Sequence, residues 1–588
     1  MNKIMLKKNK LLYNVIFIFM LALSLFRIVY NFSFLKEGYH SDEIWNFGLS
    51  NSYYEPFVCQ NADHTEKTNM DMWFSSEVMK DYLTVDKEHR FCYDSVIFNQ
   101  DHDYHPPLYY LILHTICSFF PGKISFWYAF SINIFAYIIA SVFFYKLIYQ
   151  ITKSEITALY GYMFYAFSSG ILNTFVFVRM YALLSMFAVL CIYYHARLYY
   201  TGKRKYIISV MIITLLGALT HHFYLPFAAG ISLCFCIYYL IKKKYKTMFE
   251  YGLSILGTAV LSVIIYPATI DHLFSGRIDD PKYTLSWQII MTLNCMLNEL
   301  FGFCLPVILD FSMTAVMIVV FCSVLIISPL FFLFRKNEIF KRIISSMKNW
   351  IKKIPDRIKR MDLIVVSSFV TALVVILLTA FTVSLMLMNV YTDRYIFIIY
   401  PCVCVVFIYL ISAITKKLLH KSIIRYIIAV GFCLTFTVFS NLNTGCIYLF
   451  EKPDDAVSVK EITEDSNCVL FNEDHWFLTC FTYELTDSHY IFSTTGKNME
   501  KTIINLPNVP DKDKPLYFIV NAVLFKNEEQ TDSYVLEGRM PRMGISSDKY
   551  NMMSKQEFET LVKELYPKCE YVGHDVIFKT EYFIYRVN

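Results

Sequence analysis

The feature that most constrains this chain is a series of apolar runs, each close to the length that crosses a lipid bilayer. A transmembrane helix needs about 20 mostly apolar residues. Only 18% of the 588 residues are charged and 56% are hydrophobic, whereas soluble domains carry about a quarter charged residues. We therefore expect a polytopic α-helical membrane protein, with spans near residues 11–29, 126–149, 156–171, 176–199, 206–220, 223–241, 249–268, 311–333, 362–388, 396–415 and 424–443.

The stretch between His105 and Lys153 leaves two counts of spans open. These residues are expected on opposite sides of the membrane, so the chain crosses an odd number of times between them. The run Leu108–Phe120 is too short for an ordinary span, whereas residues 126–149 are long enough. Either the short run is re-entrant or interfacial, or three short crossings occur, and the prediction is about 11–13 transmembrane helices.

Basic residues indicate which loops face the cytoplasm. Lysines precede the first apolar run and no small-residue cleavage site follows it, so we expect an uncleaved first helix with a cytoplasmic N-terminus. The net charge of +5 therefore reflects topology, and no nucleic-acid partner is expected. The basic loops that fall on the cytoplasmic side are residues 197–205, 242–246, 335–360 and 416–425.

Two polar regions interrupt the apolar pattern. The first is an outer loop at residues 31–105, which belongs to a transmembrane module covering residues 1–443. The second is the tail at residues 444–588, where charges and prolines return and no run is long enough to span a bilayer. We expect this tail to form an extracytoplasmic mixed α/β domain, whose four cysteines leave disulfide pairing open. Its predicted elements are strands at Cys468–Phe471, Leu516–Val520 and Tyr582–Val587 and a helix at Lys555–Tyr566.

The segment YHSDEIW, at residues 39–45, places two adjacent carboxylates shortly after the first span. A carboxylate whose pKa is raised by a partly apolar site can take a proton from an attacking hydroxyl. Trp45 and Phe47 follow and can build an interfacial wall around Asp42 and Glu43. We therefore predict Asp42 and Glu43 as catalytic residues; the alternative is that they are ordinary solvated loop acids.

The segment DHDYHPPLYY, at residues 101–110, opens the next apolar run. Pro106 and Pro107 suit a helix start and fix the chain there. His105 is then held at the membrane boundary, where a histidine can hydrogen-bond a phosphate or offset its charge when protonated. We predict phosphate binding for His105 and a lining role for Tyr109; the alternative is a helix-entry turn with an incidental histidine.

Cationic side chains at the outer ends of spans are further candidates, because Arg grips phosphate oxygens bidentately and stays charged. A charge at the membrane boundary is a functional candidate by default, although a snorkelling Arg is the competing explanation. We predict phosphate binding for Arg179 and Arg394, and site lining for Arg277 and Tyr395.

His221 and His222 end a span on the same predicted side. Neighbouring helix positions point about 100° apart, so one metal ion bound by both is not expected. We expect one of them to line the site and the other to pack or to face water. The sequence supports no cofactor, although it does not exclude a divalent metal.

Five motifs occur in one order: SDE after the first span, HPPLYYLILH at 105–114, RMYALLSMFAVL at 179–190, LTHHFYLPF at 219–227 and DRYIFIIYP at 393–401. This order resembles the bacterial GT-C glycosyltransferases related to protein O-mannosyltransferases and aminoarabinose transferases. The similarity covers roughly residues 10–415. The resemblance implies a GT-C fold and an inverting single displacement, in which a sugar moves from a polyprenyl-phosphate donor to an acceptor at the outer membrane face.

The resemblance also implies roles for single residues. Asp42 matches the family's first-loop catalytic acidic residue, with Glu43 beside it. His105 occupies the position of a phosphate-contacting lysine in the EKPPL motif of aminoarabinose transferases. Tyr104 and His105 replace that Glu and Lys, so a metal site using the Glu is not expected, and the sequence is closer to the mannosyltransferase-like branch.

The expected partners are a polyprenyl-phosphate-linked sugar donor, membrane lipid, and an acceptor that is a cell-envelope glycan, lipid or protein. One alternative is a flippase or transporter for a lipid-linked glycan, which would place ionisable residues near mid-bilayer and often has repeated halves. The candidates here gather at one face and no repeat is visible. A glycan polymerase is a further alternative, because it shares the membrane setting and differs in donor and acceptor.

Overall fold

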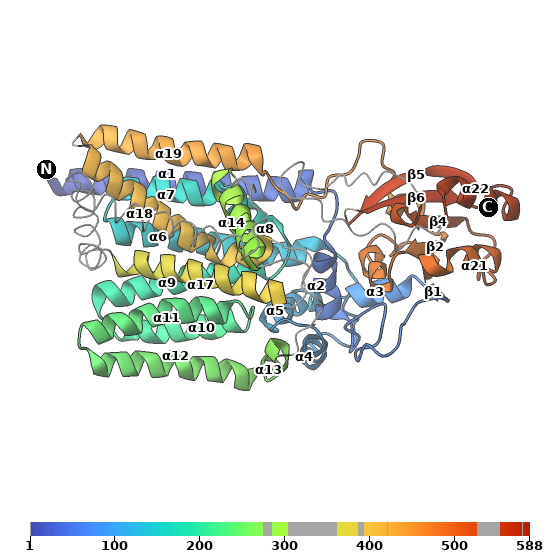
Figure 1. Ribbon diagram of the computed structural model, residues 1–588, viewed down its shortest axis with the longest axis horizontal. Helices are drawn as coiled ribbons and strands as arrows, with labels where there is room; N and C mark the ends of the chain where they lie inside the picture. Colours follow the sequence, from blue (N-terminus) through green and yellow to red (C-terminus); the bar gives the residue numbers. More distant parts are fainter. Residues whose placement is uncertain are drawn as a thin grey trace, which may run out of the picture. The chain divides into compact units, whose positions relative to one another are not determined.

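The computed structural model divides the chain into two compact units (Figure 1). The first, which we call the helical unit, comprises Met1–Leu25, Ala136–Thr174 and Leu183–Gly445. The second, the mixed unit, comprises Phe26–Phe135, Phe175–Ala182 and Cys446–Asn588. The structure describes residues 2–274, 285–303, 362–385, 393–419, 421–525, 553–578 and 580–588.

The helical unit consists of long apolar helices, and α9, α10, α11, α12 and α17 lie beside one another in it (Figure 1). Its elements are α1 (Asn2–Tyr30) and α6 (Phe126–Thr152), each shared with the mixed unit, then α7 (Glu155–Phe167), α8 (Ser169–Val176), α9 (Tyr181–Thr201), α10 (Lys205–Ala218), α11 (Tyr224–Ile241), α12 (Tyr245–Ile265), α13 (Thr269–Phe274), α14 (Leu285–Phe301), α17 (Leu363–Leu385), η2 (Asp393–Ile399), α18 (Tyr400–Leu418) and α19 (Ser422–Asn443).

Within the described part of the chain, eight helices are long and apolar enough to cross a membrane. The chain is therefore a multi-pass membrane protein, and the expected polytopic helical class is confirmed. The span expected at 311–333 lies outside the described residues, so the total of 11–13 stays a prediction. The short run opened by HPPLYY is α5 (Leu108–Ser118), which belongs to the mixed unit, and the choice between the re-entrant or interfacial alternative and three short crossings stays a prediction.

A buried polar network links three of the spanning helices. His195 on α9 hydrogen-bonds Tyr251 of α12 through Nε2, at 2.7 Å, and its Nδ1 lies 2.8 Å from the Cys191 carbonyl. The Tyr251 hydroxyl donates in turn to Ser232 of α11, at 3.0 Å. Polar groups buried among apolar helices need such partners, so this network fixes how α9, α11 and α12 pack.

The mixed unit combines the first polar loop with the C-terminal tail. The loop forms η1 (Asn31–Leu35), α2 (Ser41–Asn51), β1 (Trp73–Ser75), α3 (Glu77–Leu83), α4 (Tyr93–His102) and α5. The tail forms α20 (Val459–Ile462), β2 (Asn467–Asn472), η3 (His475–Phe481), β3 (Tyr490–Thr495), η4 (Gly496–Asn498), α21 (Met499–Ile504), β4 (Leu516–Asn521), η5 (Ala522–Leu524), α22 (Lys555–Leu565), β5 (Glu570–Ile577) and β6 (Thr580–Arg586).

These strands build one six-stranded sheet in the order β1-β3-β2-β4-β6-β5. The pairs β2–β3 and β2–β4 are parallel, and the other three pairs are antiparallel. The expected mixed α/β tail is thereby confirmed. The edge strand β1 comes from the first polar loop, and it pairs Trp73 with Phe492 and Ser75 with Tyr490.

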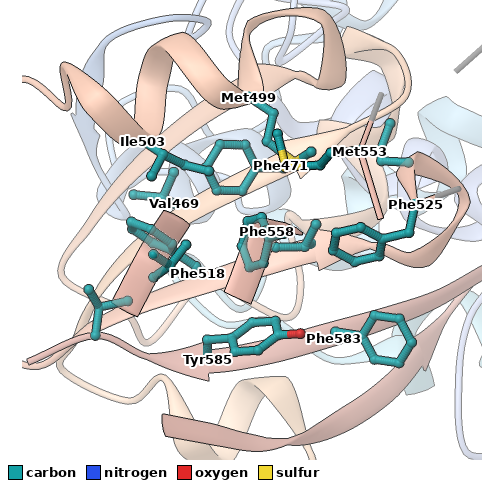
Figure 2. Packing of buried hydrophobic residues seen from close by; sticks show 14 of the residues in the cluster. Val469, Phe471, Met499, Ile503, Phe518, Phe525, Met553, Phe558, Phe583 and Tyr585 are labelled. Carbon is teal, nitrogen blue, oxygen red and sulfur yellow. The ribbon is translucent and has the colours of Figure 1, made fainter. Parts of the chain in front are cut away.

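One face of the sheet forms an apolar core (Figure 2). Val469 and Phe471 of β2, Phe518 of β4, and Phe583 and Tyr585 of β6 point to this face because alternate residues of a strand share a face. Helices α21 and α22 cover it with apolar side chains that include Met499, Ile503, Phe558 and Val562. The four tail cysteines, Cys446, Cys468, Cys480 and Cys569, form no disulfide in the described part of the chain.

A non-helical segment at residues 177–180 interrupts the helix expected at 176–199, because α8 ends at Val176 and α9 begins at Tyr181. The expected start of that helix was therefore wrong. Asn133 donates its side-chain amide to the carbonyls of Phe175, at 3.0 Å, and Phe177, at 2.8 Å. Side chains thus replace the helical partners that these backbone groups lack.

Candidate functional site

Three segments of the mixed unit meet around the SDE motif: residues 36–46, residues 101–110 and residues 175–182. They bring together five of the predicted site residues, which are Asp42, Glu43, His105, Tyr109 and Arg179. Hydrogen bonds and buried charges define the arrangement, and each residue has its own environment.

Helix α2 begins at the SDE motif with His40 as its N-cap. The His40 Nδ1 accepts a hydrogen bond from the backbone N–H of Asp42 at 3.0 Å. The Glu43 carboxylate accepts one from the backbone N–H of His40 at 2.8 Å. The Asp42 carboxylate lies in the first turn, with 14% of its side chain exposed and its Oδ1 at 3.7 Å from His40 Nδ1. The positive end of the helix dipole favours the ionised form of such a carboxylate.

Glu43 is fully buried and its carboxylate is surrounded by donors. Its Oε2 accepts from Lys36 Nζ at 3.0 Å and from the His40 N–H, and its Oε1 accepts from the Val178 N–H at 2.8 Å. Burial raises the pKa of Glu43, while Lys36 is the largest contribution that lowers it. The geometry thus gives Glu43 a cross-linking position between the start of α2 and residues 177–180.

Arg179 is buried to 3% exposure beside the start of α2. Its Nη1 donates to the Asp42 carbonyl and to Asn46 Oδ1, both at 2.9 Å, and Asn46 donates its amide to the Val178 carbonyl. The guanidinium Nε has no hydrogen-bond partner. A buried charged donor without a partner is costly, so this nitrogen is available to a ligand that brings an acceptor.

Asp103 and His105 form a hydrogen bond at the entry to α5, with His105 Nδ1 at 2.7 Å from Asp103 Oδ2. Burial opposes the charge of Asp103, but His105 and then Arg179 outweigh it and hold the pKa of Asp103 below its ordinary range. The contact between the Asp103 carboxylate and Nδ1 orients the His105 ring. Asp103 therefore lies near both side chains predicted to bind phosphate, His105 and Arg179.

Two tyrosines follow the prolines on α5, and both are fully buried. The hydroxyls of Tyr109 and Tyr110 have no hydrogen-bond partner, and both rings lie in the electrostatic neighbourhood of Arg179. Together with Arg179 Nε, they leave three donors unsatisfied in one buried cluster. Buried polar groups in folded proteins are normally paired, so the cluster suits a ligand rich in acceptor oxygens, such as a phosphate or a sugar.

The other predicted site residues belong to the helical unit. The Phe223 ring lies 5.1 Å from His221 and 5.5 Å from Tyr395, and the Arg394 guanidinium lies 5.6 Å from the Tyr395 ring. His222 lies 5.7 Å from His272 of α13. The start of α11 and the start of η2 thus form a second polar and aromatic group. Arg277 lies outside the described residues.

The structure adds four residues that sequence reasoning did not single out: Lys36, Asn46, Asp103 and Tyr110. Asp103 and Tyr110 lie inside the DHDYHPPLYY segment, so the motif itself was the available signal. Asn46 is one helical turn beyond Asp42, a spacing that places both on one side of α2. For Lys36 no local signal exists, because its partners are seven and 412 residues away.

No group of three or more His, Cys, Asp or Glu side chains within the described residues is arranged to hold a metal ion. The two predicted histidines at residues 221 and 222 lie in the turn between α10 and α11, so the expectation that they end a helix was wrong, and they contact different rings, Phe223 and His272.

Comparison with solved structures finds similar chains. The chain is similar to the apo-state crystal structure of ArnT from Cupriavidus metallidurans, with a TM-score of 0.46, 8% sequence identity and coverage of 97% of each chain. No family model matches the sequence. No curated protein matches it either.

Proposed function

We propose that this protein is an inverting glycosyltransferase that moves a sugar from a polyprenyl-phosphate donor to a cell-envelope glycan, lipid or protein at the outer face of the membrane. The observation that carries the proposal is the buried cluster of Arg179, Tyr109 and Tyr110 with unsatisfied donors, which lies beside the partly exposed carboxylate of Asp42. The ordered motifs support the GT-C type of enzyme, and the apolar helices of the chain support a lipid-linked donor.

In the proposed reaction Asp42 takes the proton from an acceptor hydroxyl. The hydroxyl oxygen then forms a bond to the anomeric carbon, and the bond from that carbon to the phosphate oxygen breaks with inversion. The proton stays on the Asp42 carboxylate, and the electron pair leaves on the polyprenyl phosphate. Asp42 suits this role because its carboxylate is partly exposed and lies in the first turn of α2, beside the buried donors of Arg179, Tyr109 and Tyr110.

Negative charge develops on the leaving phosphate, so positioned donors stabilise the transition state. In the proposal these donors are His105, oriented by Asp103, the free Nε of Arg179 and the hydroxyls of Tyr109 and Tyr110. Donors held in place before the reaction cost little reorganisation when the charge appears. Phosphate binding by Arg394 stays a prediction, and Arg394→Gln in the same assay tests it.

The first test is Asp42→Asn, which keeps the shape of the side chain and removes its basicity. Loss of a general base lowers rates by roughly 10²–10⁴-fold. We expect a loss of that order in sugar transfer, measured with the purified full-length protein, a panel of undecaprenyl-phosphate sugars and a cell-envelope fraction as acceptor. Glu55→Gln is the matched control, because it makes the same chemical change at an exposed carboxylate of the same loop.

Binding of undecaprenyl phosphate separates catalysis from folding in this test. The Asp42→Asn variant should still bind this product, because the donors around Arg179 remain. Full transfer activity in the variant would contradict the role of Asp42. A flippase or transporter has no need of a base at this position, so retained activity together with vesicle transport of a lipid-linked glycan would favour that alternative.

A further inference from the structure

The segment that enters the C-terminal domain, residues 446–452, lies against the start of the SDE motif, and we call it the entry segment. The Glu37 N–H donates to the Leu449 carbonyl at 2.9 Å, and the Lys452 N–H donates to Glu37 Oε2 at 2.5 Å. Both belong to the mixed unit, so these contacts lie within one compact body. The chain immediately before α2 is thus bonded to the chain immediately before the tail domain.

Lys36 connects these two segments from the inside. Its ammonium donates to Glu43 Oε2 at 3.0 Å and to the Tyr448 carbonyl at 2.6 Å, and the side chains of Lys36 and Glu43 are fully buried. The ammonium also lies 5.0 Å from the Phe450 ring and 5.2 Å from the Tyr39 ring. A buried ion pair is retained only when further hydrogen bonds complete it, and here the Tyr448 carbonyl does so.

The entry segment also touches the third segment of the site. The Tyr448 ring stacks on Phe177, with centroids 4.2 Å apart and an interplanar angle of 19°. The next residue, Val178, donates its N–H to Glu43. Glu43 therefore bonds directly to Val178 and, through Lys36, is connected to the Tyr448 carbonyl of the entry segment. Arg179 donates to the Asp42 carbonyl.

The backbone of the entry segment is itself constrained. Phe450 has φ of +52°, in the left-handed region that bulky residues rarely adopt. Such strain persists where surrounding contacts over-determine the conformation. Gly38 leaves room for this turn, because a Cβ at that position would lie 3.0 Å from the Phe450 Cβ.

We propose that Lys36 is a positioning residue, through which the entry segment of the C-terminal domain fixes the first turn of α2 and hence the Asp42 carboxylate. The inference rests on the proposed function, since it takes Asp42 as the catalytic group. The C-terminal domain is then part of the catalytic arrangement and is more than an attached binding module. Neither Lys36 nor the entry segment touches the substrate in this proposal.

The test is Lys36→Met in the purified full-length protein, with Lys87→Met as control at an exposed lysine of the same loop. We expect kcat to fall at least about 30-fold, because a misplaced carboxylate slows the chemical step. The KM for the undecaprenyl-phosphate sugar and the Kd of undecaprenyl phosphate should change less than about threefold, because the phosphate donors remain. Hydrogen exchange in peptides covering residues 41–51 should rise. Unchanged kcat or unchanged exchange would overturn the proposal.

The double variant Lys36→Met with Glu43→Gln separates positioning from charge compensation. The double variant removes both buried charges. It therefore lacks the unpaired Glu43 carboxylate that would destabilise Lys36→Met alone. Positioning by the entry segment predicts that kcat stays low, since the link to the Tyr448 carbonyl is still missing. Recovery of full kcat in the double variant would overturn the proposal.

Two further readouts cover other outcomes. If Lys36→Met does not fold, Gly38→Ala perturbs the same contact from the opposite side by pressing on Phe450, and it should lower kcat and raise exchange in residues 41–51. Normal values in Gly38→Ala would overturn the proposal. Hydrogen exchange needs no transfer assay, so it tests the link between the entry segment and the start of α2 by itself. If the protein transfers no sugar, the proposed function fails, and this link is still tested.

Discussion

Asp42 and Glu43 are neighbours in the sequence, yet the structure gives them opposite environments. The Asp42 side chain keeps 14% of its surface exposed, whereas Glu43 is fully buried and accepts hydrogen bonds from Lys36, His40 and Val178. Successive residues of a helix point about 100° apart, so one position faces outward while the next faces the protein. This difference makes Asp42 the better candidate for proton transfer and Glu43 the better candidate for holding the site together.

The buried ion pair leads to a prediction about pH. Burial raises the pKa of Glu43 above its ordinary 4.5, and Lys36→Met would raise it further by removing the largest lowering contribution. From 4.5 up to the raised pKa the folded state binds more protons than the unfolded state, so stability falls as pH rises. The melting temperature, measured at several pH values between about pH 4.5 and pH 8, should therefore fall more steeply with rising pH for Lys36→Met than for the wild type. The same pH dependence of the melting temperature in both proteins would show that Lys36 does not change the pKa of Glu43.

Arg179→Lys tests a second residue of the site. Arg179 uses one nitrogen for the Asp42 carbonyl and Asn46, and leaves Nε free. Lysine keeps the charge, but its donors all lie on one nitrogen. It therefore cannot bond to the Asp42 carbonyl and Asn46 and also to a phosphate on the Nε side. We expect transfer to fall at least about tenfold and the Kd of undecaprenyl phosphate to rise. Arg586→Lys, at an exposed arginine, is the control, and wild-type values in Arg179→Lys would contradict the role.

At the scale of elements, α2 depends on close packing against α3. Gly48 of α2 leaves no room for a side chain, because a Cβ there would lie 2.0 Å from Tyr82 Cζ. Tyr82 is buried and its hydroxyl donates to the Pro56 carbonyl at 3.0 Å, so its ring has little freedom to move. The conformation of Gly48 is helical, and the constraint is therefore one of space.

We predict that Gly48→Ala destabilises the mixed unit by about 1–3 kcal/mol, the usual cost of overpacking. Denaturant unfolding followed by tryptophan fluorescence measures the change. Gly431→Ala is the matched control, because a Cβ at Gly431 meets open space within a helix. An equal effect at both positions would mean that the Tyr82 contact does not limit packing.

Sequence patterns predicted elements well where one property dominates. Most of the apolar spans within the described residues, and the strands β2, β4 and β6, were expected within a few residues, because long apolar runs and β-branched or aromatic segments are local signals. The span expected at 156–171 was wrong, because α7 ends at Phe167 and α8 begins at Ser169. The break at residues 177–180 contains no Gly or Pro and was missed, since distant Asn133 and Glu43 create it. Strand β1 was also missed, because three residues carry no period of their own.

The candidate site shows the same limit. Asp42, His105, Tyr109 and Arg179 were found from motifs, and the structure places them in one unit. The network that holds them includes Lys36 and Tyr448, which are 412 residues apart and leave no trace in any window of sequence. The roles of Arg394, His221 and His222 stay predictions, and the predicted boundary between residues 443 and 444 also stays one.

At the scale of the whole molecule, β1 ties the first polar loop to the tail domain. Trp73 packs on Phe492 with ring centroids 5.5 Å apart, and its Nε1 donates to the Pro507 carbonyl at 3.2 Å. Trp73→Ala should release the loop, so that limited proteolysis cuts near residues 59–72 much faster while the strands β2 to β6 stay protected. Met72→Ala, at a side chain that is 53% exposed, is the control. Equal cleavage of both variants would contradict the tie.

The contacts of Lys36 with Tyr448 and of β1 with β3 can form only late in the synthesis of the chain. Synthesis runs from the N-terminus, so Lys36 and β1 exist for hundreds of residues before their partners, which lie 412 residues downstream in the case of Lys36. Contacts of such long range form late. A nascent or truncated chain therefore lacks the hydrogen bond from Lys36 to the Tyr448 carbonyl beside the start of α2.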